Sequence, residues 1–182
     1  MNLHFRDLRL RRRGRWILLS ALIGTVSGFG AILFDLMFRF SEHNLIGGIG
    51  RFQPPGTGME GGPGHDPENI WLLPVSLVVG GLISGALVFR FAPEAEGHGT
   101  DGVLHAFHHL KGKIRKRVPL VKALASAVTI GSGGSAGREG PIAQIGAGFG
   151  SFLATRLKLS HRERRIMMAA GIGAGVGSIF RA

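Results

Sequence analysis

The sequence predicts an all-α membrane protein that crosses the bilayer several times and contains broken or re-entrant helices. Hydrophobic residues make up 45% of the 182 residues and charged residues only 18%, which is less charge than a soluble domain of this size usually carries. Two uncharged segments, Trp16 to Phe34 and Ile70 to Phe89, each approach the roughly 20 residues that a bilayer core requires. The later apolar segments are shorter and interrupted by glycine, which indicates helices that end inside the membrane.

The basic residues lie beside these apolar segments, and their positions predict the topology. Residues 1–15 form a basic N-terminus, which we expect in the cytosol because positive charge next to membrane helices stays on that side. The following apolar run is too long for a signal peptide and has no convincing cleavage site. Glu42 to Asn69, rich in glycine and proline, is expected to form a loop on the opposite face. Two further basic clusters, Lys111 to Arg117 and Arg156 to Arg165, fit the cytosolic surface and would attract anionic lipids.

After residue 91 the predicted helices become short. Gly97 to Gly102 is expected to break the chain before a short helix, Val103 to Leu110. Three apolar segments of less than a full span follow: Val118 to Ile130, Pro141 to Thr155 and Ile166 to Phe180. Broken helices whose N-termini point at the membrane midplane are how transporters hold anions.

The stretch Gly131 to Pro141, GSGGSAGREGP, is the most informative part of the chain. Consecutive glycine and serine residues can turn their backbone N–H groups inward to bind an anion, and a helix beginning near Pro141 would add the positive end of its dipole. Pro141 suits the first helical position because it has no N–H to leave unpaired. Glu139 places a carboxylate where an anion would sit, so it would compete with the anion until it is protonated.

These residues resemble a known family. GREGP, followed by an apolar glycine-rich helix, is similar to the signature of the CLC chloride channels and proton-coupled chloride transporters, particularly their prokaryotic members. Gly97, His98 and Gly99 stand in the place of that family's first anion-binding loop, GSGIP. The order of the apolar segments from Trp16 to Ala182 also fits the first helices of the family, so residues 16–182 resemble the first inverted half of its membrane domain.

The resemblance implies chloride transport in the cell (inner) membrane by a protein that is not an enzyme and needs no cofactor. It implies that the complete protein is a homodimer in which each subunit has its own anion pathway. Glu139 matches the gating glutamate. The implied anion-binding residues are His98, Gly99, Gly137, Arg138, Glu139 and Gly140. Attraction by amides and a helix dipole is weak enough to release the ion.

Three departures from the family pattern limit what can be carried over. His98 replaces a serine whose hydroxyl usually meets the ion, and Asp101 replaces the proline of the loop, so anion selectivity stays open. The chain has no tyrosine, whereas family members place a coordinating tyrosine in the second half. The sequence stops within what resembles a continuing helix, so we expect a portion of a longer protein. Whether that protein is a channel or an exchanger is not decided.

Alternative functions have weaker signals. Gly131, Gly133 and Ala136 satisfy the dinucleotide-binding pattern, with Arg156 at the distance of a 2′-phosphate ligand, but no alternation of strands and helices surrounds them. A net charge of +11 could suggest nucleic acid, but the basic clusters lack interleaved aromatic residues and a recognition motif. A metal site would need one continuous helical face, which the nearby glycines oppose; its candidate ligands are His98, Asp101, His105 and His109.

Several other residues carry separate expectations. Small-residue pairs, Gly24 with Gly28 and Gly81 with Gly85, could let helix backbones approach closely. Lys122 is expected to reach the cytosolic surface, and residues 162–165 to form a solvated helix start. Asp35 and Arg39 are spaced to pair. Arg138 could either attract anions or anchor the glycine segment by bonding carbonyls.

Overall fold

The computed structural model describes residues 12–52 and 70–180, and every regular element in these two ranges is helical. A π-helical segment, η1 (His43–Ile49), extends the first helix, and a short 3₁₀ helix, η2 (Pro93–Ala95), follows the second. The predicted all-α fold is confirmed. The α-helices are α1 (Arg12–Glu42), α2 (Leu72–Phe91), α3 (Thr100–His108), α4 (Arg117–Gly131), α5 (Glu139–Arg156) and α6 (His161–Phe180).

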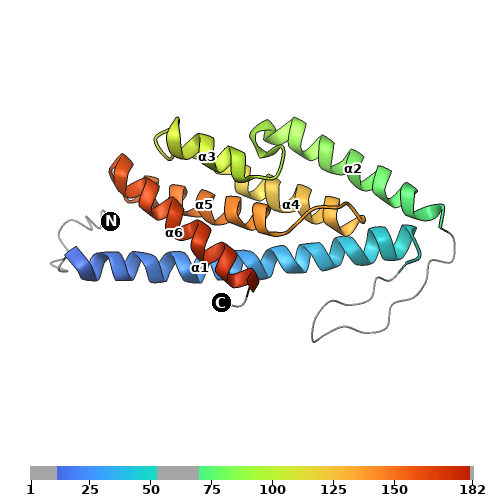
Figure 1. Cartoon of the computed structure of the whole chain (residues 1–182), viewed down its shortest axis with the longest axis horizontal. Coiled ribbons are helices and arrows are strands. Elements are labelled where there is room, and N and C mark those ends of the chain that lie inside the picture. The colour runs from blue at the N-terminus through green and yellow to red at the C-terminus, as the bar shows by residue number, and fades with distance from the viewer. Residues whose placement is uncertain (1–11, 53–69, 181–182) are drawn as a thin grey trace.

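The helices are arranged around a long α1 (Figure 1). This helix runs along one side of the molecule, and α4, α5 and α6 pack directly against it. On the other side of these three, α2 packs on α4 and α3 packs on α5. Helices α4 and α5 therefore lie in the middle of the molecule, with α1 on one side and α2 and α3 on the other.

Close contact between α5 and α6 depends on glycine. A Cβ atom added to Gly146 would overlap the carbonyl oxygen of Gly171, and one added to Gly171 would overlap that of Gly146. Gly150 lies equally close to the backbone of Met167. The small-residue pairs noted in the sequence behave differently, because Gly24, Gly28, Gly81 and Gly85 have nothing within 4 Å of an added Cβ. These four positions therefore do not mediate helix packing within the described part of the chain.

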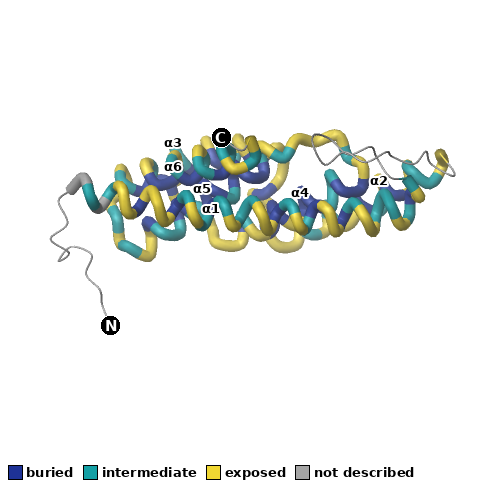
Figure 2. The backbone as a smooth tube through the Cα atoms, turned by 90° about the horizontal axis from the view of Figure 1, so that it is seen from below, coloured by how far each residue is buried: buried dark blue, intermediate teal, exposed yellow. Residues whose placement is uncertain are grey.

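The rest of the chain leaves much of the two predicted spans exposed (Figure 2), and the exposed side chains are largely apolar. The helical stretch Trp16–Ile49 reaches a mean hydropathy of 2.1 and Leu72–Phe91 reaches 2.2, yet only 22% and 17% of their most apolar windows are buried. Large side chains such as Phe29 and Leu82 are about two-thirds exposed, at 68% and 70%. The core helix of a soluble protein would be mostly buried, so these surfaces fit a lipid environment.

Several predicted boundaries are wrong by a few residues. Helical structure continues from α1 through η1 to Ile49, so the loop expected from Glu42 begins later, and residues 53–69 lie outside the described part. Helix α5 begins at Glu139, which makes Pro141 its third residue. A proline is equally tolerated there because the first four N–H groups of a helix lack intrahelical acceptors.

The start of α6 is partly as predicted. Ser160 and Glu163 form a reciprocal cap, in which Ser160 N donates to Glu163 Oε2 at 2.9 Å and Glu163 N donates to Ser160 Oγ at 3.3 Å. The expectation of a solvated start is wrong for Arg164, which is buried and donates from Nη1 to the carbonyl of Lys111 at 3.4 Å. The turn at Gly112, whose φ is +75°, approaches the Arg164 stem and covers it.

Candidate anion-binding site

A glycine-rich loop before α3 touches the first turn of α5, which directly follows a second glycine-rich loop. The first glycine loop (Gly97–Gly99) precedes α3, and the second glycine loop (Ser132–Arg138) precedes α5. A Cβ added to Gly140 would overlap the carbonyl oxygen of His98, and one added to Gly99 would lie 3.1 Å from the carbonyl oxygen of Gly140. Gly99 also has a φ of +96°, a conformation that side chains other than glycine rarely adopt. Both glycines are therefore required for the contact.

The contact brings two helix N-termini together. Helix α3 begins at Thr100 and α5 begins at Glu139, and neither N-cap residue supplies a side-chain hydrogen bond. The first N–H groups of a helix have no intrahelical partner, and the helix dipole adds partial positive charge there. The junction of the first glycine loop with the start of α5 thus presents backbone donors that suit an anion.

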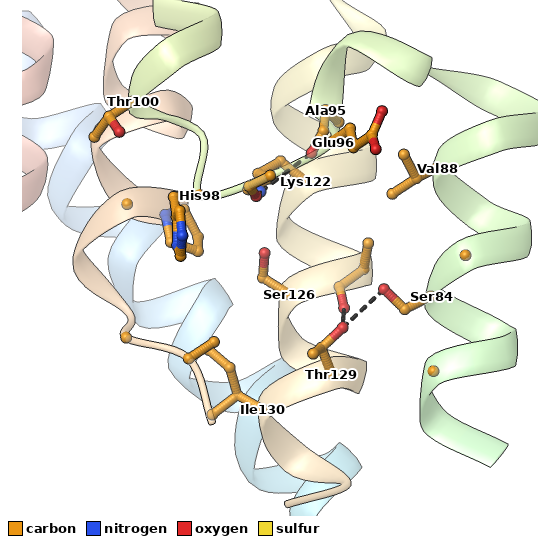
Figure 3. A pocket seen from close by; sticks show the side chains of 18 of the residues that line it. Ser84, Val88, Ala95, Glu96, His98, Thr100, Lys122, Ser126, Thr129 and Ile130 are labelled. Atoms are coloured by element: carbon orange, nitrogen blue, oxygen red, sulfur yellow. Dashed lines mark hydrogen bonds between the residues drawn. The ribbon is translucent and has the colours of Figure 1, made fainter. Parts of the chain in front are cut away.

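A cavity of about 590 Å³ lies beside this junction, between α2, α4 and the two loops. Polar side chains from three segments line it: Ser84 on α2, His98 on the first glycine loop, and Lys122, Ser126 and Thr129 on α4 (Figure 3). Thr129 Oγ1 donates to Ser84 Oγ at 2.8 Å, which links α4 to α2 across the cavity. Apolar side chains including Val88 and Ile130 complete the wall.

Most of the residues expected at the anion site do gather here. His98, Gly137, Glu139 and Gly140 line the cavity. Gly99 is buried behind them, packed between the Gly140 carbonyl and the side chains of Lys122 and Gln144.

Glu139 lies at the first position of α5, and its carboxylate is close to the second glycine loop. A Cβ added to Gly137 would overlap Glu139 Oε2, so the carboxylate lies directly over Gly137. Negative charge in the first turn of a helix is favoured by the dipole. A carboxylate in this place uses the same partial positive charge that would attract an anion.

The side chain of Arg138 anchors the second glycine loop, as one of the two alternatives predicted, but through a different partner. Its Nη1 donates to Asp35 Oδ1 at 3.2 Å, and its guanidinium lies 3.8 Å from the ring centroid of Phe38. Asp35 also accepts from Arg39 Nε at 2.7 Å, as the spacing of that pair predicted. Arg138 therefore attaches the second glycine loop to α1 through a carboxylate and an aromatic ring, rather than through carbonyls.

Sequence reasoning missed the contribution of α4. Lys122, expected at the cytosolic surface, is 5% exposed, because its side chain reaches the carbonyls of Ala95 and Gly97 and packs against Gly99. A signal was available in the spacing, since Lys122, Ser126 and Thr129 recur at i, i+4 and i+7 and so share one helical face. Gln144 gave no such signal, yet its side chain is buried beneath Gly99 and Gly102.

The dinucleotide-binding and metal-site alternatives find no support in the structure. The second glycine loop follows helix α4, whereas a dinucleotide-binding loop follows a β-strand. His98 lies before α3 rather than on it, so the four suggested metal ligands do not share a helical face. In residues 12–52 and 70–180, no group of three or more such side chains is placed to hold a metal ion.

Comparison with known proteins places the same residues in a family context. The family model described as voltage gated chloride channel matches residues 80–182. The chain is 27% identical over 172 residues to the H(+)/Cl(-) exchange transporter ClcA of Klebsiella pneumoniae (strain 342), which covers 91% of this chain and 33% of the relative. It is 28% identical over 168 residues to an uncharacterized protein of Methanocaldococcus jannaschii, covering 92% and 35%.

A solved structure shows the same fold over the same part of the chain. The crystal structure of a slow cyanobacterial Cl-/H+ antiporter superposes with a TM-score of 0.58 at 25% identity, covering 91% of this chain and 36% of that one. The chain thus spans about a third of the length of the relatives that it matches.

Proposed function

The chain belongs to the voltage gated chloride channel family, and on this premise we propose that it forms part of a chloride pathway through a membrane. The observation that carries the proposal is the contact of the first glycine loop with the first turn of α5, which joins the uncapped starts of α3 and α5. The names of the relatives support chloride as the ion, since those proteins are described as exchanging chloride and protons. Chloride is the transported ion, and the pathway requires no cofactor.

In the proposed mechanism, backbone amides attract the ion and Glu139 controls its passage. The amides of Gly99, Gly137, Arg138, Glu139 and Gly140, together with the imidazole of His98, surround the anion position. Partial charges on amides bind an anion more weakly than a fixed ammonium or guanidinium group would, so the ion can leave again. The Glu139 carboxylate occupies the anion position when ionised and gives it up when protonated or displaced.

We propose further that residues 1–15 are cytosolic and that residues 16–182 form the membrane domain, in the cell (inner) membrane. The two later basic clusters meet at one end of the molecule, because Arg165 Nη2 donates to His108 O at 3.3 Å and Arg164 reaches Lys111 O. The start of α1 lies at that same end, where Leu19 packs with Leu157 (Figure 1). Three basic segments at one end support a cytosolic location for it, where anionic lipids are the expected neighbours. The complete protein is proposed to be a homodimer.

The test of the proposed function is chloride efflux from liposomes across a range of pH. The natural polypeptide that carries this sequence is used at its full length. In the Glu139→Gln variant, which mimics the protonated carboxyl group, we expect chloride flux that no longer changes with pH and no longer moves protons. Glu94→Gln is the matched control, because Glu94 is exposed, lies outside the cavity and pairs with Arg115. Wild-type pH dependence in the Glu139 variant would remove Glu139 from the gating role.

A further inference from the structure

Lys122 is bonded to the backbone just before the first glycine loop. Its Nζ donates to the carbonyl oxygen of Ala95 at 3.1 Å and to the carbonyl oxygen of Gly97 (Figure 3). The side chain is 5% exposed, and no ion pair with it is found in the described part of the chain. A buried ammonium without hydrogen-bond partners is strongly unfavourable. The carbonyls of Ala95 and Gly97 therefore stabilise the buried ammonium of Lys122. The same two hydrogen bonds restrain the backbone at Ala95 and Gly97.

The bond to Gly97 acts directly on His98. The carbonyl of Gly97 and the N–H of His98 belong to one planar, trans peptide unit, so fixing the carbonyl also fixes the direction of the N–H. Accepting a hydrogen bond from an ammonium polarises that peptide and makes its N–H a stronger donor. Lys122 thereby controls both the orientation and the donor strength of the first amide of the His98–Gly99 pair.

The stem of Lys122 acts on Gly99 as well. A Cβ added to Gly99 would lie 3.1 Å from Lys122 Cε and 2.9 Å from Gln144 Oε1. Gly99 is therefore enclosed by α4 on one side and α5 on the other, in addition to its contact with Gly140. Lys122 thus touches the first glycine loop at two levels, with its ammonium on the carbonyls before His98 and its methylene chain on Gly99.

We propose that Lys122 is a positioning residue for anion binding, which holds the first glycine loop in the conformation that presents the His98 and Gly99 amides. This inference rests on the proposed function only in assigning an anion to those amides. The alternative is that Lys122 attracts the anion by its charge alone and leaves the loop unaffected. The two are separable, because only a positioning residue changes the mobility of the loop when it is replaced.

The experiment compares Lys122→Met, which keeps the stem and removes the ammonium, with Lys113→Met, which removes an exposed lysine from the turn before α4. Both are made in the full-length natural polypeptide in detergent micelles. Amide hydrogen exchange of the peptide covering residues 96–102 measures the loop, and calorimetric titration with potassium chloride measures the anion site. For Lys122→Met we expect exchange at least about tenfold faster and chloride binding about tenfold weaker. Lys113→Met should match the wild type in both.

Each outcome distinguishes a positioning role of Lys122 from a purely electrostatic one, or separates the loop from the chloride pathway. Unchanged exchange in Lys122→Met overturns the inference, and weaker chloride binding alongside it would identify a purely electrostatic role. Faster exchange with unchanged chloride binding would retain Lys122 as the support of the loop and remove the loop from the proposed chloride pathway. Lys122→Arg should restore most of the protection and the binding, because it keeps the charge and the donors. If the methionine variant does not fold, Lys122→Gln is used with the same two measurements.

Discussion

At the scale of single residues, Gly140 decides whether the first glycine loop can touch the first turn of α5. We predict that Gly140→Ala destabilises the protein by about 1–3 kcal/mol, because the new methyl group would overlap the carbonyl of His98 and neither backbone can move freely. The gain in helix propensity, up to about 1 kcal/mol, is smaller. Thermal unfolding in detergent measures the effect. Gly24→Ala is the matched control, since it has open space and should be neutral or slightly stabilising; equal stability of the two variants would contradict the close contact.

His98 tests whether side chains or amides supply the attraction for the anion. Its side chain is exposed on the cavity wall, and the amides at the starts of α3 and α5 remain when it is replaced. We predict that His98→Ser keeps chloride transport and shifts the preference for chloride over nitrate, as measured by competition in liposome flux assays. Loss of all transport in a well-folded variant would show instead that the imidazole is indispensable.

The sequence predicted those residues of the candidate site that belong to a short motif. It did not predict those whose position depends on tertiary packing. Glu139, Gly137 and His98 stand in short patterns that the sequence displays. Lys122 was misplaced because snorkelling is the usual behaviour of a lysine near a helix start, whereas here its ammonium binds carbonyls of a segment distant in the sequence. Arg138 was assigned the wrong partner because Asp35 lies far away in the sequence.

At the scale of elements, α5 and α6 form a pair whose separation is set by glycine. We predict that Gly171→Ala destabilises the protein by about 1–3 kcal/mol, because its methyl group would overlap the carbonyl of Gly146 across the interface. Gly173→Ala, two residues along the same helix, has nothing within 4 Å and should be neutral or stabilising by up to about 1 kcal/mol. Unfolding of the two variants in the same detergent gives the comparison. A larger loss in Gly173→Ala than in Gly171→Ala would rule out this glycine contact.

The existence of the helices followed from the sequence more reliably than their ends. Apolar length alone located α1 and α2, and glycine clusters located the breaks before α3 and α5. The ends were missed where neighbouring contacts override local signals. Helical backbone continues into η1, which packs against α2 and α4. Conversely, the glycine pairs in α1 and α2 suggested packing that the described helices do not use.

At the scale of the whole molecule, charge and apolar surface are separated along its length. The start of α1, the turn before α4 and the turn before α6 lie at one end and carry the basic clusters, whereas η1 lies at the far end of α1 (Figure 1). Between these ends, the outward faces of α1 and α2 are apolar and open. A lipid bilayer matches this arrangement, with apolar faces in its core and the basic end at the anionic surface.

This arrangement predicts which end of the molecule faces the cytosol. Residues 1–182 contain no cysteine; once any cysteine elsewhere in the full-length polypeptide is replaced, a single introduced cysteine reports its own position. Lys113 lies at the basic end and Asn44 lies in η1, and both side chains are exposed. In sealed right-side-out vesicles, a membrane-impermeant maleimide should label Asn44→Cys at once and Lys113→Cys only after the membrane is permeabilised. The reverse pattern would invert the proposed topology, and immediate labelling of both would show that the described helices do not separate the two sides of the membrane.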